Sequence, residues 1–391
     1  MMTKRVPIDT YCEKKIPTLQ KAYDGLIDYV DISSVDNTEK KIISYQTIEA
    51  TDAPSRAKQV LKQGDVLVST VRPNLNAVAV VEEETENLMV GSTGYCVLRC
   101  KNNMDVRYLF NFCQSQYFID DMSSQATGAS YPAVSNGIVR NALIPCYPIE
   151  EQREIAEKLD TVSKLLVLRK QQLSKLDELV KSRFVEMFGD PVSNPFKWST
   201  LTMKQASIRL SDGPFGSNLK SEHYTLEGVR VIRLGNIGCG CFNDEDQSYI
   251  SQEHYATIKK YTCRAGEIVI ATLGDPNLRA CIIPDHIEYG VNKSDCVHYI
   301  PKAEILNNQF VCQYINCPET LSLASGMVHG QTRSRISSGQ LSDLPIYLPP
   351  MDLQQQFASF VEQTDKSKFE IQKSLEKLET LKKALMQKYF G

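Results

Sequence analysis

Side chains suited to contacts with DNA gather in a few short loops of the sequence. Arginine pairs with guanine through two hydrogen bonds, asparagine and glutamine pair with adenine, and serine, threonine and tyrosine hold phosphate groups. The same residue types are also common in turns that bind nothing, so for each single residue a turn and a DNA contact are both open. The residues for which we predict DNA contact are Arg72, Asn74, Asn76, Thr127, Ser130, Tyr131, Ser217, Asn218, Lys220, Asn277, Arg279, Gln331, Thr332, Arg333 and Arg335.

Signatures of catalysis are largely missing from the sequence. It contains no G-x-x-x-x-G-K-[ST], H-E-x-x-H or G-x-S-x-G motif. The glycine-rich residues 212–220 lack the spacing of a phosphate-binding loop, which favours a surface loop over a phosphate cradle. All five histidines lie in the second half of the chain, and the twelve cysteines form no C-x-x-C pair. We therefore expect free thiols and no catalytic, cofactor-binding or metal-binding residue.

The charge of the chain is nearly balanced, with a net value of −3 over 391 residues. DNA-binding chains are usually basic, but two windows here contain no acidic residue, one between Asp121 and Glu150 and one between Glu319 and Asp343. Such windows favour local contact with DNA while partner proteins supply more of the positive field. No run of eighteen apolar residues occurs, so we expect no membrane contact and a cytoplasmic location.

Two long segments must position these loops. Residues 149–188 contain neither proline nor glycine and are rich in good helix formers, which predicts a helix of roughly 60 Å. A matching segment follows at residues 350–391. Alternating three- and four-residue steps predict an interaction seam on each helix. The seams are Leu159, Val162, Leu166, Arg169, Leu173, Leu176, Val180, Arg183 and Met187 in the first helix, and Val361, Thr364, Lys368, Ile371, Leu375, Leu378, Lys382, Leu385 and Tyr389 in the second. Because polar positions of one seam correspond to apolar positions of the other, we predict that the helices pair with each other rather than standing as unrelated exposed helices.

The two helices belong to an internal repeat with an offset of 202 residues. Phe188 corresponds to Phe390, and Gly189 corresponds to Gly391. Each copy begins with short strands rich in valine and tyrosine. In the first copy we predict an amphipathic helix over residues 105–122 and a last strand over residues 142–147.

We predict an α+β fold with a pseudo-two-fold internal repeat. Two similar α/β domains would be separated by two long helices that form an antiparallel coiled coil. The expected boundaries are residues 1–148 and 190–349 for the domains and residues 149–189 and 350–391 for the helices. Two similar heads on a stiff spacer suit a DNA target with two separate parts.

The sequence resembles the DNA-specificity subunit of type I restriction–modification systems. The resemblance spans the whole chain and rests on short motifs at both ends of the helices and in the loops. These motifs are PIEEQREI at 148–155, FVEMFGD at 184–190, LPPMDLQ at 348–354, GPFGS at 213–217 and GQT at 330–332. The second helix departs from the pattern, with LQQQ at 353–356 where the first has EQRE at 151–154.

The resemblance implies a non-catalytic adaptor with two target recognition domains, one for each part of a split double-stranded DNA sequence. It implies that the paired helices set the gap between the two parts. The implied partners are two methyltransferase subunits, which hold S-adenosylmethionine, and restriction subunits, which use ATP and Mg²⁺. Two other hypotheses stay open: a coiled-coil scaffold that binds only proteins, and a fused restriction or methylation enzyme.

Overall fold

The computed structural model describes residues 4–325 and 335–391. The chain forms two compact units, here named unit 1 (Met1–Gln171 with Gln372–Gly391) and unit 2 (Gln172–Ile371). Helix α4 (Ile149–Phe188) begins in unit 1 and ends in unit 2, whereas α9 (Met351–Phe390) begins in unit 2 and ends in unit 1. Each unit is therefore completed by parts of both long helices.

The predicted seams of the long helices are confirmed. Every seam position of α4 and α9 is buried or half-buried. In unit 2 the polar seam residue Lys368 is balanced by Asp177 of α4, with 2.6 Å between the ammonium nitrogen and a carboxylate oxygen. Helix α4 ends where Gly189 adopts a φ of 80°, a left-handed conformation that glycine adopts without strain.

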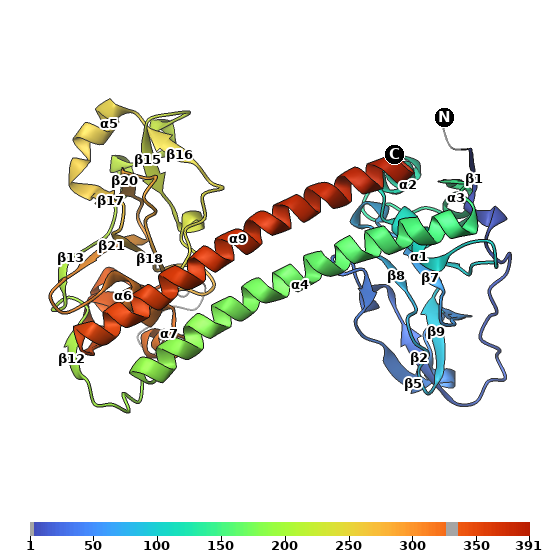
Figure 1. The fold of residues 1–391 in the computed structure, drawn as a ribbon, viewed down its shortest axis with the longest axis horizontal. Coiled ribbons are helices and arrows are strands. Elements are labelled where there is room, and N and C mark those ends of the chain that lie inside the picture. The colour runs from blue at the N-terminus through green and yellow to red at the C-terminus, as the bar shows by residue number, and fades with distance from the viewer. Residues whose placement is uncertain (1–3, 326–334) are drawn as a thin grey trace. The chain divides into compact units, whose positions relative to one another are not determined.

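The helices run antiparallel within each unit (Figure 1). In unit 1 the first turns of α4 and the last turns of α9 share one hydrophobic core, and in unit 2 the last turns of α4 meet the first turns of α9. The core residues concerned are Ile155, Ala156, Leu159, Leu385, Met386 and Phe390 in unit 1, and Val180, Phe184, Phe188, Phe357 and Val361 in unit 2. The pairing predicted from the sequence is therefore observed in both units.

The phenylalanine at the end of each long helix anchors it in a different unit. Phe390 is fully buried, and its ring centroid lies 5.3 Å from that of Tyr108 and 5.6 Å from that of Phe112. Phe188 is equally buried, and its ring lies 4.9 Å from Phe310. Burying one such ring contributes about 1.5–3 kcal/mol, so each terminus stabilises the unit that it enters.

Unit 1 contains three small sheets with strand orders β10-β7-β8, β5-β2-β9-β6 and β1-β11, and a two-stranded hairpin β3-β4. Strands β2 and β9 are parallel and the other pairs are antiparallel. The strands are β1 (Arg5–Pro7), β2 (Leu26–Val30), β3 (Val35–Asp36), β4 (Lys41–Ile42), β5 (Gln46–Glu49), β6 (Ala57–Val60), β7 (Val66–Ser69), β8 (Val78–Val80), β9 (Leu88–Ser92), β10 (Tyr95–Leu98) and β11 (Leu143–Pro145). The short helices are α1 (Val106–Cys113), α2 (Gln116–Gln125) and α3 (Asn136–Asn141).

Unit 2 repeats the three sheets of unit 1 as β13-β21-β18-β19, β14-β16-β15-β20-β17 and β12-β22, with β13 and β14 as added edge strands, and its parallel pair is β15 with β20. The strands are β12 (Ser199–Thr202), β13 (Ser207–Ser211), β14 (Tyr224–Thr225), β15 (Val229–Ile232), β16 (Ser248–Ile250), β17 (Thr262–Arg264), β18 (Ile268–Ala271), β19 (Arg279–Ile282), β20 (Tyr289–Asn292), β21 (Cys296–Pro301) and β22 (Pro345–Leu348). The short helices are α5 (Gln252–Thr257), α6 (Asn308–Asn316), α7 (Pro318–Ser325) and α8 (Ser338–Asp343). Strands β7 and β18, helices α3 and α8, and helices α4 and α9 are offset by 202 residues at both ends, so the predicted repeat is confirmed.

The prediction of one helix over residues 105–122 is wrong. The segment forms two helices, α1 and α2, because Ser115 has an extended backbone and its hydroxyl accepts the Phe118 N–H as the N-cap of α2. Serine favours such caps over helix interiors. The predicted last strand contains β11, which pairs with β1.

Candidate nucleic-acid interface

The two predicted loop windows of unit 1 meet in space. Backbone bridges join Val71 to Ala133 and Thr127 to Ala133. The Arg72 N–H donates to the Pro132 carbonyl at 2.7 Å. Residues 72–76 and 127–133 therefore form one surface, as is needed if they contact the same part of a ligand.

Arg72 and Tyr131 form an exposed pair on this surface. The guanidinium carbon of Arg72 lies 4.7 Å from the centre of the Tyr131 ring, and 68% of the Tyr131 side chain is exposed. The Arg72 backbone is left-handed, with a φ of 50°, which costs a non-glycine residue about 1–2 kcal/mol. A planar cation held over an aromatic ring can donate paired hydrogen bonds to a base edge. Three further predicted residues, Asn74, Thr127 and Ser130, are also exposed.

Asn76 instead points into unit 1. It is buried, its side-chain amide donates to the Cys113 carbonyl at 2.8 Å, and its side-chain oxygen accepts a hydrogen bond from Lys40 at 3.0 Å. These bonds hold the 72–76 loop against α1. The geometry therefore assigns Asn76 a positioning role, and we leave it out of the proposed DNA-contacting set.

Unit 2 repeats the same framework with different side chains. Leu273 pairs with Arg335, at the positions equivalent to Val71 and Ala133. A guanidinium nitrogen of Arg335 lies 2.7 Å from a carboxylate oxygen of Asp295, and the Thr272 N–H donates to the Asp295 carbonyl at 3.1 Å. Arg335 is exposed, so it remains open to a ligand beside its carboxylate.

The third window of unit 2, residues 212–220, approaches the same region. A side chain at Gly213 would lie 2.2 Å from the Asn292 carbonyl oxygen, so only glycine fits this close contact. Beyond it, the three predicted residues are exposed, and the Asn218 carbonyl is 2.9 Å from a His254 ring nitrogen. These exposed residues are Ser217, Asn218 and Lys220. The predicted contacts Gln331, Thr332 and Arg333 lie outside the described residues.

The Arg279 side chain is engaged within unit 2, and Asn277 is buried there. The Arg279 guanidinium donates to four backbone carbonyls, including Pro276 at 2.8 Å and Leu234 at 3.0 Å. Asn277 is 8% exposed. An arginine whose nitrogens already hold the main chain has little left to donate to a base, so the geometry gives Arg279 a positioning role, and burial withdraws Asn277 from contact with a base.

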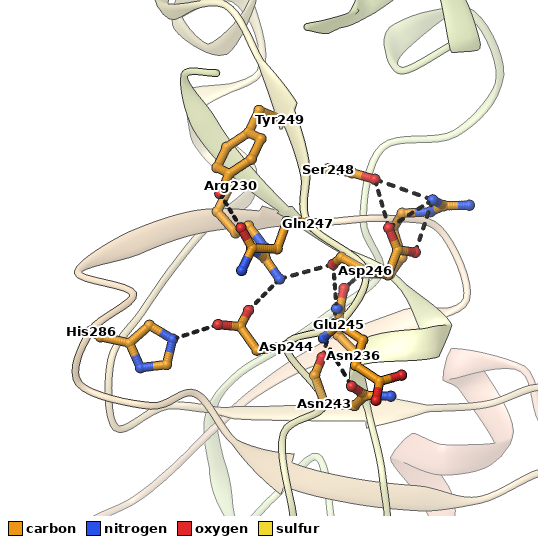
Figure 2. Close-up of polar contacts among 11 residues, drawn as sticks. Arg230, Asn236, Asn243, Asp244, Glu245, Asp246, Gln247, Ser248, Tyr249 and His286 are labelled. Atoms are coloured by element: carbon orange, nitrogen blue, oxygen red, sulfur yellow. Dashed lines mark hydrogen bonds and ion pairs between the residues drawn. The ribbon is translucent and has the colours of Figure 1, made fainter. Parts of the chain in front are cut away.

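A polar network fixes residues 236–249 against β15 (Figure 2). Arg230 donates to the Asp244 carboxylate at 2.5 Å and to the Asp246 carbonyl at 2.9 Å. His286 lies 3.0 Å from the other Asp244 oxygen, and Arg233 lies 2.9 Å from the Asp246 carboxylate. Arg230, Asp244 and His286 border a cavity of about 270 Å³. Because both carboxylates already have cationic partners, the network acts as a support for the loop.

Two buried glutamines that the sequence analysis did not single out connect the long helices to the loop-bearing domains. In unit 1, Gln152 of α4 accepts the Asp105 N–H at 3.0 Å and donates to the Tyr147 carbonyl at 2.9 Å. In unit 2, Gln354 of α9 accepts the Asn307 N–H at 2.8 Å and donates to two carbonyls. Both glutamines lie inside the motifs that carry the family resemblance. Their place in these motifs is the sequence feature that could have identified them as functional residues.

Comparison with known proteins assigns the family. Residues 9–178 and 229–383 match the profile of the type I restriction modification DNA specificity domain, and together they exceed half of the chain. The chain belongs to this family. It is therefore a specificity subunit, the non-catalytic DNA-binding component of a type I restriction–modification complex. Two separate matches in one chain agree with the internal repeat.

Individual relatives are distant. The type I restriction enzyme MjaVIII specificity subunit of Methanocaldococcus jannaschii is 23% identical over 299 residues, covering 72% of this chain and 69% of that protein. The HindI specificity subunit of Haemophilus influenzae is 24% identical over 173 residues, covering 43% of this chain and 37% of that protein.

Two solved structures share the fold. One, from work on complex assembly and conformational transition of a type I restriction–modification system, has a TM-score of 0.63 and 24% identity and covers 99% of this chain and 97% of its own. The other, the S subunit from M. genitalium, has a TM-score of 0.58 and 15% identity and covers 99% and 96%. Among the described residues of the specificity subunit, no helix is long and apolar enough to cross a membrane, and no cluster of His, Cys, Asp and Glu has the arrangement of a metal site.

Proposed function

We propose that each unit of this specificity subunit reads one part of a two-part DNA target. The observation that carries the proposal is the repeated bridge, Val71 with Ala133 in unit 1 and Leu273 with Arg335 in unit 2. The framework is the same, but an arginine beside Asp295 stands where unit 1 has an alanine, and Gly274 stands at the position of the stacked Arg72. Equal frames with unlike side chains suit the reading of two unlike short sequences.

We propose further that the chain binds two methyltransferase subunits and, through the assembled complex, restriction subunits. The long helices expose large apolar side chains at positions related by the repeat. Val167 and Leu381 are exposed in unit 1, and Phe369 and Leu179 are exposed in unit 2. The repeat matches Val167 with Phe369 and Leu179 with Leu381, so each unit exposes one residue of each matched pair. Two similar apolar surfaces fit two copies of a single partner. A protein-only scaffold or a fused enzyme would not need two diverged loop sets.

The test maps methylation with the full chain and its methyltransferase partner expressed together in cells that lack other methyltransferases. The expected target consists of two short sequences with a fixed, unread gap. Arg72→Ala should relax or weaken only one of the two sequences, because Arg72 belongs to one unit. Arg56→Ala removes another exposed arginine of unit 1 outside the loops and should change neither sequence. A single continuous target, or equal damage to both parts by Arg72→Ala, would refute the proposal.

A further inference from the structure

Two half-buried lysines of unit 1, Lys40 and Lys382, lie near each other, and Lys40 contacts the 72–76 loop. Lys40, in the turn between β3 and β4, donates from its ammonium group to the Asn76 carbonyl at 2.5 Å and to its side-chain oxygen at 3.0 Å. Burial, and then the positive charge of Lys382 on α9, lower the pKa of Lys40 to about 8. Burial also lowers the pKa of Lys382, which faces Asp160 and Lys170.

The two acidic groups that face these lysines also accept other hydrogen bonds. One carboxylate oxygen of Asp36 accepts the backbone N–H groups of Thr38 and Glu39, both at 2.7 Å. Asp160 accepts a hydrogen bond from Arg107 at 2.7 Å. The cluster therefore carries more positive than negative charge in a partly buried place, an arrangement that a bound anion would stabilise.

Unit 2 has a turn at the equivalent place that is two residues shorter and lacks the lysine. Its turn is closed by the bridge of Ile237 with Phe242, and Gly240 lies two residues before that closing residue, as Lys40 does before Ile42. Both residues have a left-handed backbone, with φ values of 78° for Gly240 and 58° for Lys40. Glycine adopts this conformation freely, whereas lysine does so at a cost, so backbone stability does not explain Lys40.

The helix position gives the same contrast. The repeat matches Lys382 with Val180, which is buried in the core of unit 2. Valine suits a packed helix seam better than a lysine that must lose water. Unit 1 thus has two lysines at positions that favour uncharged residues. The left-handed backbone at Lys40 favours glycine, and the packed helix seam at Lys382 favours an apolar residue.

We propose that Lys40 and Lys382 form a binding site for a phosphate of the DNA backbone next to the 72–76 loop, and that only unit 1 has this site. The inference rests on the proposed function, because it takes the ligand to be DNA. Lys40 is hydrogen-bonded to the loop that carries Arg72, so a phosphate held there would lie beside the loop that contacts bases. Phosphate contacts of this kind fix the position of a protein on DNA without reading sequence.

The experiment uses the full chain assembled with its methyltransferase partner and two duplexes, one with the mapped target and one with that target scrambled. Lys40→Gly and Lys382→Val copy the residues of unit 2 and remove one charge each; Lys40→Gly also removes two hydrogen bonds to Asn76. Each should weaken binding to both duplexes by roughly five- to tenfold at 0.1 M salt, and should reduce the slope of log affinity against log salt by about 0.9. Lys382→Val, which breaks no such bond, should melt at the same or a higher temperature than the original chain. Lys383→Ala, the neighbouring exposed lysine of α9, should change none of these quantities.

The pH dependence gives a second readout. In the free protein Lys40 loses its proton at about pH 8, whereas a bound phosphate favours the charged ammonium. Affinity should therefore fall as the pH rises through about 8, and this fall should be smaller in Lys40→Gly. An unchanged salt slope in both variants overturns the proposal. So does intact DNA binding with loss of the methyltransferase subunit, which would identify an acidic protein segment as the ligand. If the original complex does not prefer the mapped target to the scrambled one, the proposed function itself fails.

Discussion

Replacing Gln354 by alanine should destabilise unit 2 by about 3–5 kcal/mol. The side chain is fully buried and makes three hydrogen bonds to main chain: it accepts from Asn307 N–H at 2.8 Å and donates to the carbonyls of Ile305 at 2.9 Å and Pro349 at 2.8 Å. Each buried group left without its partner costs about 1–3 kcal/mol. Water that enters the vacated space recovers part of this loss, so the expected destabilisation lies near the lower end of the total for the three groups.

Hydrogen exchange followed by mass spectrometry suits this prediction, because a chain with two units need not unfold in one step. The opening free energy should fall in α6, whose N-cap is Asn307, and stay unchanged in α1. Gln355→Ala is the matched control, since Gln355 is the exposed next residue of α9 and alanine is a good helix former. Gln152→Ala should produce the mirror result in α1. A loss below about 1 kcal/mol for Gln354→Ala, or an equal loss for Gln355→Ala, would refute the claim that these hydrogen bonds hold the helix to the domain.

Two further predictions concern the long helices. Phe390→Ala should lower the opening free energy of unit 1 by about 3–5 kcal/mol, and Phe188→Ala should lower that of unit 2 by a similar amount, because each ring fills a core and leaves a cavity when removed. Hydrogen exchange measures both values. A loss in unit 2 for Phe390→Ala, or in unit 1 for Phe188→Ala, would contradict the observed packing. Inserting seven residues, about two helical turns, into the middle of both helices lengthens each helix by roughly 10 Å. At 3.4 Å per base pair, methylation mapping should then find that the unread gap in the DNA target is longer by about three base pairs. An unchanged gap would rule out the helices as the spacer.

The long helices and the repeat could be predicted from sequence because both depend on regular spacing. The run without proline or glycine ends at Gly189, and the seam positions recur with a period that only a paired helix requires. The split between α1 and α2 was missed because the apolar residues on both sides continue a helical pattern across Ser115. Its hydroxyl forms a local cap that outweighs this pattern.

The candidate site was predictable only in part. Residue type and loop position selected Arg72 and Tyr131, and the structure brings these two side chains together on the surface of unit 1. The same reasoning also selected Asn76 and Arg279, whose side chains turn inward and hold main-chain groups. Exposure depends on the surrounding fold, and the sequence pattern does not encode it. Lys40 was not selected, because its neighbour Lys382 lies at the other end of the chain.

The placement of Phe390 has a consequence for synthesis on the ribosome. Unit 2 is one continuous stretch, Gln172–Ile371, whereas unit 1 joins Met1–Gln171 to Gln372–Gly391. The aromatic cluster of Tyr108 and Phe112 is therefore completed by Phe390, a ring that is translated only after the whole of unit 2. The half that emerges first must stay incomplete, with apolar surface open to chaperones, until the half that emerges second has been made.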